Sequence, residues 1–307
     1  MSKLVIVGTV AFDAIETPFG KTDKILGGAA TYIGLAASQF NADGAIVSVV
    51  GGDFPEEYIA MLKNNNLDVS GLEIVKEGKT FFWSGKYRND MNSRDTLATE
   101  LNVLENFQPK VPENYTDAEV VMLGNLHPLV QLSVIEQMDS PKLIVLDTMN
   151  FWMDNALAEL KQVIAKVDVI TINDEEARQL TGEYSLVVAA QKIREMGPEY
   201  VVIKKGEHGA LLFHTEDVFF APALPLEEVF DPTGAGDTFA GGFTGYLAKT
   251  RDYSYENMKN AIIYGSALAS FCVEKFGTER LENLTKKEVH RRLKQFQNLT
   301  QFDIELT

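Results

Sequence analysis

Residues 143–204 read LIVLDTMNFWMDNALAELKQVIAKVDVITINDEEARQLTGEYSLVVAAQKIREMGPEYVVIK, and this stretch decides the fold. Its three apolar runs are typical of strands buried on both faces of a parallel sheet. These runs are Leu143–Leu146, Val167–Ile172 and Tyr200–Lys204. The helical patterns Asn155–Ala165 and Leu186–Met196 separate them. The alternation predicts strand–helix–strand units with right-handed crossovers.

The same alternation extends to the rest of the chain. Further strands are expected at Leu4–Val7, Ala45–Val50, Glu119–Leu123 and Val218–Ala221. Further helices are expected at Ala29–Gln39, Glu56–Asn65, Leu129–Met138, 236–249, 255–275 and 285–297. The fold class is therefore α/β, with a doubly wound, mostly parallel sheet flanked by helices. Ligands of such sheets bind beyond the carboxyl ends of the strands.

Two segments interrupt this rhythm, because neither contains an amphipathic helix. They are residues 12–25 and about 78–104. Alternation at Phe82, Ser84 and Lys86 indicates exposed antiparallel strands. We expect one domain over residues 1–307, with these two segments forming a small β lid. An edge hairpin packed on the domain is the alternative.

Composition narrows the function further. The 28 basic and 44 acidic residues give a net charge of −16, which argues against nucleic-acid and membrane partners. Cys272 is the only cysteine, so an internal disulfide and a multi-cysteine metal site are excluded. No apolar run approaches the ~18 residues of a membrane span, and the first residues do not resemble a signal peptide. A cytoplasmic protein is expected.

The strongest motif is DPTGAGDTF at Asp231–Phe239. Its glycines can expose successive backbone N–H groups at a helix start, which predicts an anion-binding nest. Asp237 would lie in the first helical turn, where a carboxylate is useful if it accepts a proton from an attacking hydroxyl. The alternative is an ordinary helix start. Three further glycines in that helix, each costing ~1 kcal/mol against alanine, favour a special site.

The DPTGAGDTF motif resembles the carboxyl-terminal signature of the ribokinase-like (PfkB) carbohydrate kinases. Four more features match that family in the right order. They are Asp13 after the first strand, Gly27-Gly28 before a helix, Asn173 to Glu176, and Gly206 to Gly209. The resemblance covers nearly the whole chain. It implies a doubly wound domain with a small β lid, in agreement with the strand pattern.

The resemblance also implies roles for individual residues. Asp237 would be the general base, and Gly234, Ala235 and Gly236 would form the anion hole for the γ-phosphoryl group of ATP. Asp13, Gly27 and Gly28 would bind the acceptor. Asn173, Lys204, Gly206 and Gly209 would lie on the nucleotide side. Glu176 would help to organise Mg²⁺ through water, and Asp231 and Thr233 would hold a monovalent cation such as K⁺.

Several of these positions have a purely structural alternative. Asn173 and Glu176 can form a helix cap, and Lys204 can face solvent. Tyr32 stands where the family often has an asparagine, and so ordinary hexose recognition is in doubt. A ring there favours a nucleoside-like acceptor, unless Tyr32 and Trp152 are packing residues. Asn125 is a further candidate substrate contact.

The lid suggests two more roles. Asp90, Asn92 and Arg94 form a polar cluster that either closes over the substrate or caps an exposed hairpin. Phe82 and Trp83 should face opposite sides of the lid. One side would cover the acceptor and the other would form a homodimer, which Trp83→Lys should dissociate.

The favoured function is an ATP-dependent kinase that phosphorylates a hydroxyl of a sugar, polyol or nucleoside. The alternative is a catalytically silent ligand-binding or regulatory protein with the same fold. A nicotinamide dehydrogenase and a P-loop nucleotidase are disfavoured, because neither glycine motif is present.

Overall fold

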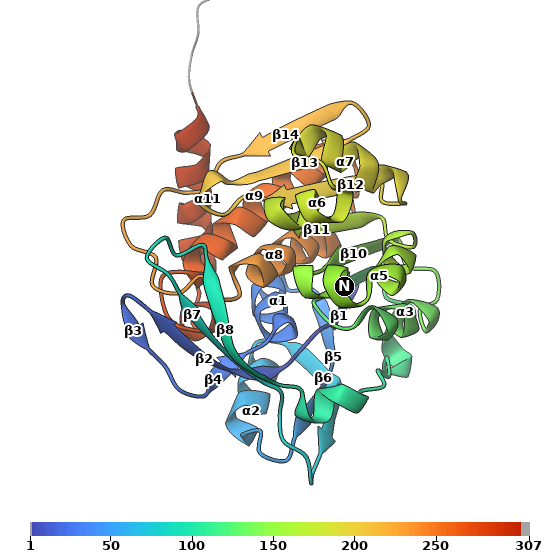
Figure 1. Cartoon of the computed structure of the whole chain (residues 1–307), viewed down its shortest axis with the longest axis vertical. Coiled ribbons are helices and arrows are strands. Elements are labelled where there is room, and N and C mark those ends of the chain that lie inside the picture. Colours follow the sequence, from blue (N-terminus) through green and yellow to red (C-terminus); the bar gives the residue numbers. More distant parts are fainter. Residues whose placement is uncertain (1, 302–307) are drawn as a thin grey trace, which may run out of the picture.

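A nine-stranded sheet forms the centre of the molecule in the computed structural model, which describes residues 2–301. Its strand order is β14-β13-β12-β11-β10-β9-β1-β5-β6 (Figure 1). Only β13 and its neighbours pair in antiparallel fashion. The strands are β1 (Lys3–Val7), β5 (Asp43–Gly51), β6 (Leu67–Val75), β9 (Val120–Leu123), β10 (Leu143–Asp147), β11 (Val169–Asn173), β12 (Tyr200–Lys204), β13 (Ala210–His214) and β14 (Asp217–Ala221).

Helices cover both faces of this sheet. One face packs against α1 (Ala29–Ser38), α2 (Glu56–Asn64), α8 (Ala235–Thr250) and α9 (Tyr255–Cys272). The other packs against α3 (Pro128–Glu136), α4 (Asn150–Asn155), α5 (Leu157–Ile164), α6 (Asp174–Thr181) and α7 (Leu186–Glu195). The short α10 (Glu279–Glu282) and α11 (Lys286–Thr300) pack with α1 and α9. Single 3₁₀ turns occur at Asn102–Asn106, Glu113–Tyr115 and Gly206–His208.

Alternate residues of each strand enter different cores. In β1, Leu4 and Ile6 belong to the core beneath α8, whereas Val5 and Val7 belong to the core beneath α3 and α5. This is the arrangement that near-continuous apolar strands require. The doubly wound, mostly parallel sheet expected from the sequence is confirmed.

Glycines allow α8 to approach its neighbours closely. A Cβ atom at Gly241 would lie 2.2 Å from the carbonyl oxygen of Ile33 in α1. A Cβ atom at Gly245 would lie 2.7 Å from the Cα atom of Ala37. The glycines of α8 thus serve backbone packing, which brings the amino-terminal ends of α1 and α8 together.

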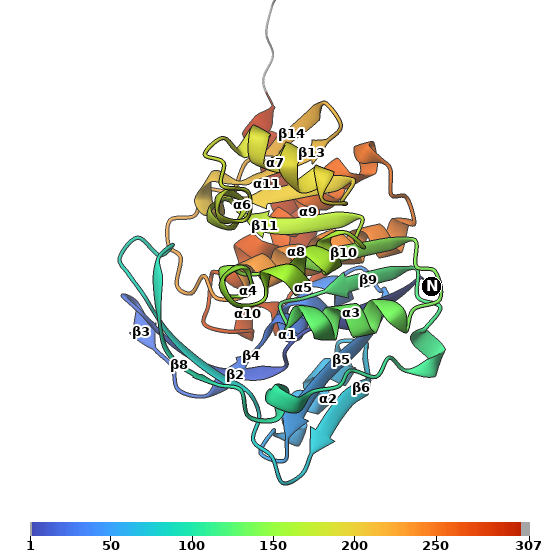
Figure 2. The same ribbon diagram turned by 45° about the vertical axis from the view of Figure 1, so that its right-hand side comes forward.

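A separate small sheet lies beside the main one (Figures 1 and 2). Its strands run in the order β3-β2-β7-β8, with β4 paired to β2. They are β2 (Ala11–Thr17), β3 (Gly20–Lys21), β4 (Ile25–Gly27), β7 (Phe82–Tyr87) and β8 (Arg94–Glu100). These strands come from the two segments in which the sequence pattern lacks helices.

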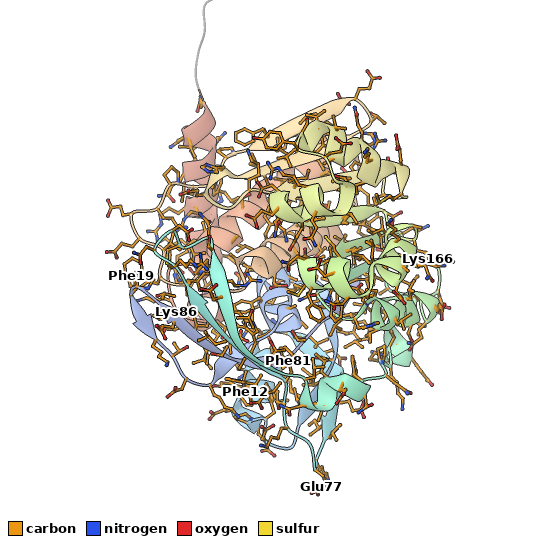
Figure 3. All side chains as sticks on the ribbon, in the orientation of Figure 1. Phe12, Phe19, Glu77, Phe81, Lys86 and Lys166 are labelled. Carbon is orange, nitrogen blue, oxygen red and sulfur yellow. The ribbon has the colours of Figure 1, made fainter. Side chains whose placement is uncertain are left out.

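The two faces of the small sheet differ in character. Phe12 and Phe82 are paired across β2 and β7 and pack against the main core (Figure 3 labels Phe12). Asp13 and Trp83 are likewise paired, and therefore share the opposite face. Phe82 and Trp83 do face opposite sides, as expected. However, Trp83 lies on the side of Asp13, so the expectation that it faces a second copy of the chain is wrong.

Several elements of the structure were not expected from the sequence pattern. β6, β13, α4 and α10 were not anticipated. Residue 1 and residues 302–307 of the expected domain lie outside the described part of the chain. Among residues 2–301, no helix is long and apolar enough to cross a membrane.

Candidate active site

The chemistry-bearing residues gather at the carboxyl edge of the main sheet. Asp147, Asn173 and Lys204 are the last residues of the adjacent strands β10, β11 and β12. The amino-terminal end of α8 lies next to these side chains. This is where an open α/β sheet binds its ligand.

The anion nest is the turn that begins α8. Gly234 caps the helix in the left-handed conformation, with φ of 74°, which a glycine adopts without strain. Gly236 and Asp237 follow in the first turn, where helical N–H groups have no acceptor within the helix. The N–H group of Ala235 donates to the carbonyl oxygen of Pro232 at 3.2 Å, whereas those of Gly236 and Asp237 lie at the positive end of a 16-residue helix, as an anion nest requires.

Asp237 lies in the same turn and is partly exposed. Burial raises the pKa of its carboxyl group, and the negative charge of Asp147 raises it further. Lys204 and Arg94 act in the opposite direction on that pKa. A carboxylate with a raised pKa next to an anion nest is suited to accept a proton at neutral pH.

Asp13 is held above the glycine pair that precedes α1. A Cβ atom at Gly27 would lie 1.9 Å from its Oδ2 atom, and one at Gly28 would lie 2.4 Å from the carbonyl oxygen of Thr9. A side chain therefore fits at neither position, so both residues must be glycine. Burial, with the charges of Asp231 and Asp237, raises the pKa of Asp13 to about 7. Asp13 and the two glycines therefore lie together, near Asp231 and Asp237, and their role in binding the acceptor stays a prediction.

Tyr32 does not point into open space. Its side chain is 1% exposed and belongs to a core cluster with α9. A Cβ atom at Gly234 would lie 2.5 Å from its ring, so the ring supports the underside of the nest. The ring thus packs as the structural alternative requires, and a contact of Tyr32 with the acceptor stays a prediction. Close packing of α1 against α8 buries the ring, and the preference for nucleosides can no longer be drawn from it.

Asn173 and Glu176 form a reciprocal cap at the start of α6. The Glu176 N–H donates to Asn173 Oδ1 at 2.7 Å, and the Asn173 N–H donates to Glu176 Oε2 at 2.9 Å. The structural alternative is thus realised. Burial raises the pKa of Glu176 to about 7, although the nearby Lys204 ammonium lowers it.

The residues present fit a magnesium ion held mainly by water and phosphate. Within residues 2–301, no group of three or more His, Cys, Asp or Glu side chains could hold a metal. Glu176 nevertheless keeps its Oε1 atom outside the helix cap. Mg²⁺ commonly uses one or two carboxylates and retains several waters.

Lys204 is not simply exposed to solvent. Its Nζ atom donates to both carboxylate oxygens of Asp147, at 2.9 Å and 3.0 Å. Nζ also lies 3.2 Å from the position that a Cβ atom of Gly236 would occupy. The ammonium group therefore lies beside the nest.

The turn from Gly206 to Gly209 contacts the tip of the small sheet. Gly206 has φ of 54°, and a Cβ atom there would lie 3.1 Å from Oδ1 of Asn92. Gly209 has no room for a Cβ atom, which would lie 2.0 Å from the carbonyl oxygen of Ala221. The tip of the β7–β8 hairpin thus reaches across to the turn that was expected on the nucleotide side.

Asp231 and Thr233 form a clamp beneath the nest. The carboxylate of Asp231 is fully buried and accepts from the N–H groups of Thr233 and Gly277, both at 2.9 Å. Thr233 Oγ1 donates to the hydroxyl of Tyr87 in the small sheet at 3.1 Å. These contacts tie the nest to the β7–β8 hairpin and to the loop after α9.

Asn125 follows β9 and contacts a neighbouring loop. Its Oδ1 atom accepts from the indole N–H of Trp152 at 2.7 Å, and its amide nitrogen contacts Met149. His127 packs edge-on against the same indole. Asn125 thus orients Trp152, which is partly buried.

Three residues lie on the inner face of the small sheet; Arg94 was expected in the polar cluster of the lid, whereas Trp83 and Tyr87 were not among the expected site residues. The indole of Trp83 lies over Gly85, where a Cβ atom would be 2.1 Å from the ring. The Arg94 guanidinium lies 5.8 Å from its centroid and lowers the pKa of Asp13, Glu176 and Asp237. Tyr87 completes the set. The strand register could have identified them, because each pairs across β7 with a site-facing neighbour.

Comparison with known proteins agrees with this geometry. Residues 1–284 match the model of the pfkB family carbohydrate kinases. A cytidine kinase of Thermococcus kodakarensis is 33% identical over 257 residues, covering 82% of this chain and 90% of that protein. A nucleoside kinase of Methanothermobacter thermautotrophicus is 27% identical, covering 90% and 91% respectively.

Solved structures show the same fold. A nucleoside kinase of Methanocaldococcus jannaschii superposes with a TM-score of 0.77 at 22% identity, covering 96% of this chain and 98% of that one. A ribokinase of Giardia lamblia gives a TM-score of 0.80 at 17% identity, covering 96% and 99%. With a carboxylate in the first turn of a glycine-capped helix and a family match across nearly all of its length, the chain belongs to the pfkB family of carbohydrate kinases and is a phosphotransferase with an alcohol acceptor.

Proposed function

We propose that the chain is an ATP-dependent nucleoside kinase. The observation that carries this proposal is the flat indole of Trp83, which lies against Gly85 on the same face of the small sheet as Asp13. An aromatic ring beside a carboxylate that can accept from a hydroxyl suits a base joined to a sugar. Relatives that are named cytidine kinase and nucleoside kinase support the same acceptor class. No observation favours a catalytically silent protein.

In this proposal the acceptor hydroxyl transfers its proton to Asp237. The hydroxyl oxygen forms a bond to the γ-phosphorus of ATP, the bond to the β-phosphate oxygen breaks, and ADP leaves. The turn of Gly234, Ala235 and Gly236 surrounds the phosphoryl group in transit, and the N–H groups of Gly236 and Asp237 stabilise its charge. Asp13, together with Gly27 and Gly28, orients the acceptor. Asn125 holds the indole of Trp152, which would contact the acceptor.

The nucleotide would lie over the ends of β11 and β12. Lys204 faces its phosphates, and the turn from Gly206 to Gly209 borders it. Mg²⁺ bound to the phosphates would neutralise part of their charge, and Asn173 and Glu176 would hold it through water. A monovalent cation such as K⁺ would bind beside the clamp of Asp231 and Thr233.

The small sheet would act as the lid of a single domain and as a dimer interface. Its β8 strand lies at the edge of the sheet, and Leu97 at the β8 bulge is 57% exposed. An exposed edge strand with an apolar side chain favours pairing with a second copy.

The function is tested by measuring ADP release with Mg-ATP over cytidine, uridine, adenosine, inosine, ribose, fructose and inositol. We expect kcat/KM to be highest for a nucleoside. A higher kcat/KM for a free sugar or inositol than for every nucleoside would contradict the proposal.

Stacking of the nucleoside base on the indole of Trp83 is tested with Trp83→Ala. Loss of stacking worth ~1 kcal/mol should raise the KM of the nucleoside about five- to tenfold and leave the KM of ATP unchanged. Lys86→Ala, on the outer face of the same strand, is the matched control. An equal loss with ribose as acceptor would show that Trp83 does not contact the base.

A further inference from the structure

A buried ion pair lies beside the anion nest. Asp147 and Lys204 end strands β10 and β12, and their carboxylate and ammonium groups meet in front of β11. The side chains are 7% and 17% exposed respectively. Both oxygens of Asp147 accept from Nζ, so the ammonium is held from one direction by a two-point contact.

The acidic member of this pair is unexpected at this place. Nζ of Lys204 borders Gly236, and therefore the site of a transferring phosphoryl group. A carboxylate next to that site repels a phosphate. The Lys204 ammonium, which both oxygens of Asp147 hold, offsets this repulsion.

Two other carboxylates compete for the same ammonium. Burial lowers the pKa of Lys204, but Asp147 first, then Glu176 and Asp237, raise it above its ordinary value. A buried ammonium that loses one carboxylate is strongly destabilised unless it finds another. Without Asp147, Lys204 would therefore turn to Glu176 or to Asp237. Pairing with Asp237 would occupy the oxygens that accept the proton.

We propose that Asp147 is a positioning residue that acts through Lys204. It holds the ammonium at the edge of the nest, where it stabilises the phosphoryl group, and it keeps the ammonium away from the carboxylate of Asp237. The base thus stays free for the acceptor hydroxyl. This inference rests on the proposed role of Asp237 but not on the identity of the acceptor.

The test is a double-mutant cycle in kcat, measured with the best acceptor of the panel. Lys204→Met should lower kcat about 10²–10³-fold, as loss of a donor to a developing charge does. Asp147→Asn should lower it about 10–100-fold, the range for groups that orient a functional group, with little change in acceptor KM. The double variant should be no slower than Lys204→Met alone. Losses that multiply would overturn the proposal, because Asp147 would then act independently.

A pH profile distinguishes positioning from a general structural defect. The charged groups that face the pair are Glu176 from α6, Asp237 from α8 and Arg94 from β8. In Asp147→Asn, both the loss of the Asp147 charge and the pairing of Lys204 with Asp237 should lower the pKa of Asp237, so the acid limb of kcat should move to lower pH. An acid limb that stays in place would overturn the proposal. Lys204→Arg should restore part of the activity that Lys204→Met loses.

A second ion pair provides the control. Arg292 of α11 donates to Glu274 at 2.5 Å and, within residues 2–301, hydrogen-bonds to neither Lys204 nor Asp237. Glu274→Gln and Arg292→Met should change Tm and leave kcat unchanged. Asp237→Asn is measured in parallel. An active Asp237→Asn would contradict the proposed base. If Asp237→Asn is inactive and the losses in kcat from Asp147→Asn and Lys204→Met multiply, only the positioning role is contradicted.

Discussion

Three acidic residues in the site, Asp13, Glu176 and Asp237, share one physical property. Burial is the largest cause of the raised pKa of each. In each case the Arg94 guanidinium of the small sheet lowers the pKa. Raised carboxyl pKa values that cluster in a cleft are typical of catalytic sites. At the scale of the residue, the site holds three carboxyl groups whose pKa burial raises toward neutral pH.

The base assignment predicts a large and specific loss in Asp237→Asn. General-base assistance is worth about 10²–10⁴-fold, so kcat should fall by at least that range. Mg-ATP should still raise Tm, because the nest donors remain. In the wild type, kcat should fall as the pH is lowered through the raised pKa of Asp237. Asp95→Asn on exposed β8 is the control, and more than about a tenth of wild-type kcat in Asp237→Asn would refute the assignment.

Asp13→Asn should stabilise the fold at alkaline pH while it impairs acceptor binding. The pKa of Asp13 is about 7 in the folded state and about 3.8 when the chain is unfolded. Between these values the folded state retains a proton that the unfolded state has lost, so the free energy of unfolding falls as pH rises. At pH 8 the variant should therefore gain about 2–4 °C in Tm. The gain should vanish near pH 4, and a lower Tm at pH 8 would contradict it.

At the scale of the element, close packing of helix ends builds the nest. α1 and α8 approach each other through glycines, and Tyr32 of α1 lies directly beneath Gly234. Asp231 joins the same turn to Gly277. The nest is thus supported from two sides by buried contacts. The β8 strand, in contrast, has its outer edge unpaired.

The proposed dimer predicts that Leu97→Asp yields a monomer. A charge at an exposed edge strand opposes pairing with a second copy, because both copies would carry it. Light scattering at tens of micromolar should give a dimeric wild type and a monomeric variant. Leu129→Asp, at a position 54% exposed on α3, should stay dimeric. A monomeric wild type would exclude the interface.

At the scale of the whole molecule, we propose that the small sheet closes the site. Tyr87 contacts Thr233 beneath the nest, and Asn92 at the hairpin tip contacts Gly206. Both contacts join the hairpin of β7 and β8 to the main sheet. A closed site excludes water from the phosphoryl group and so limits hydrolysis of ATP.

Tyr87→Phe tests this closure, because it removes only the hydroxyl that contacts Thr233. A hydrogen bond worth about 0.5–1.5 kcal/mol predicts a rise of about two- to tenfold in acceptor KM. Hydrogen exchange in the hairpin should become faster, and ATP hydrolysis without acceptor should increase. Tyr58→Phe on α2 serves as the control. Unchanged exchange in the hairpin would show that this contact does not hold the sheet closed.

Much of the fold could be predicted because its signals are local. The apolar runs of β1, β9, β10 and β12 and the helices between them are visible as periodic patterns. β6 was missed because an edge strand with exposed residues lacks a buried pattern, and α4 because it spans fewer than two turns. The nest was predictable for the same local reason, since its glycines and Asp237 are consecutive in the chain.

By itself, then, the amino-acid sequence determined the sheet, the glycine nest and the position of its carboxylate, all of which depend on neighbouring residues. Only the tertiary structure decided that Tyr32 is buried, that Trp83 faces the site and that Lys204 pairs with Asp147. Those contacts join residues far apart in the chain: Lys204 and Asp147 are 57 positions apart. They form only when helices and strands pack, because burial and strand register choose which side chains meet.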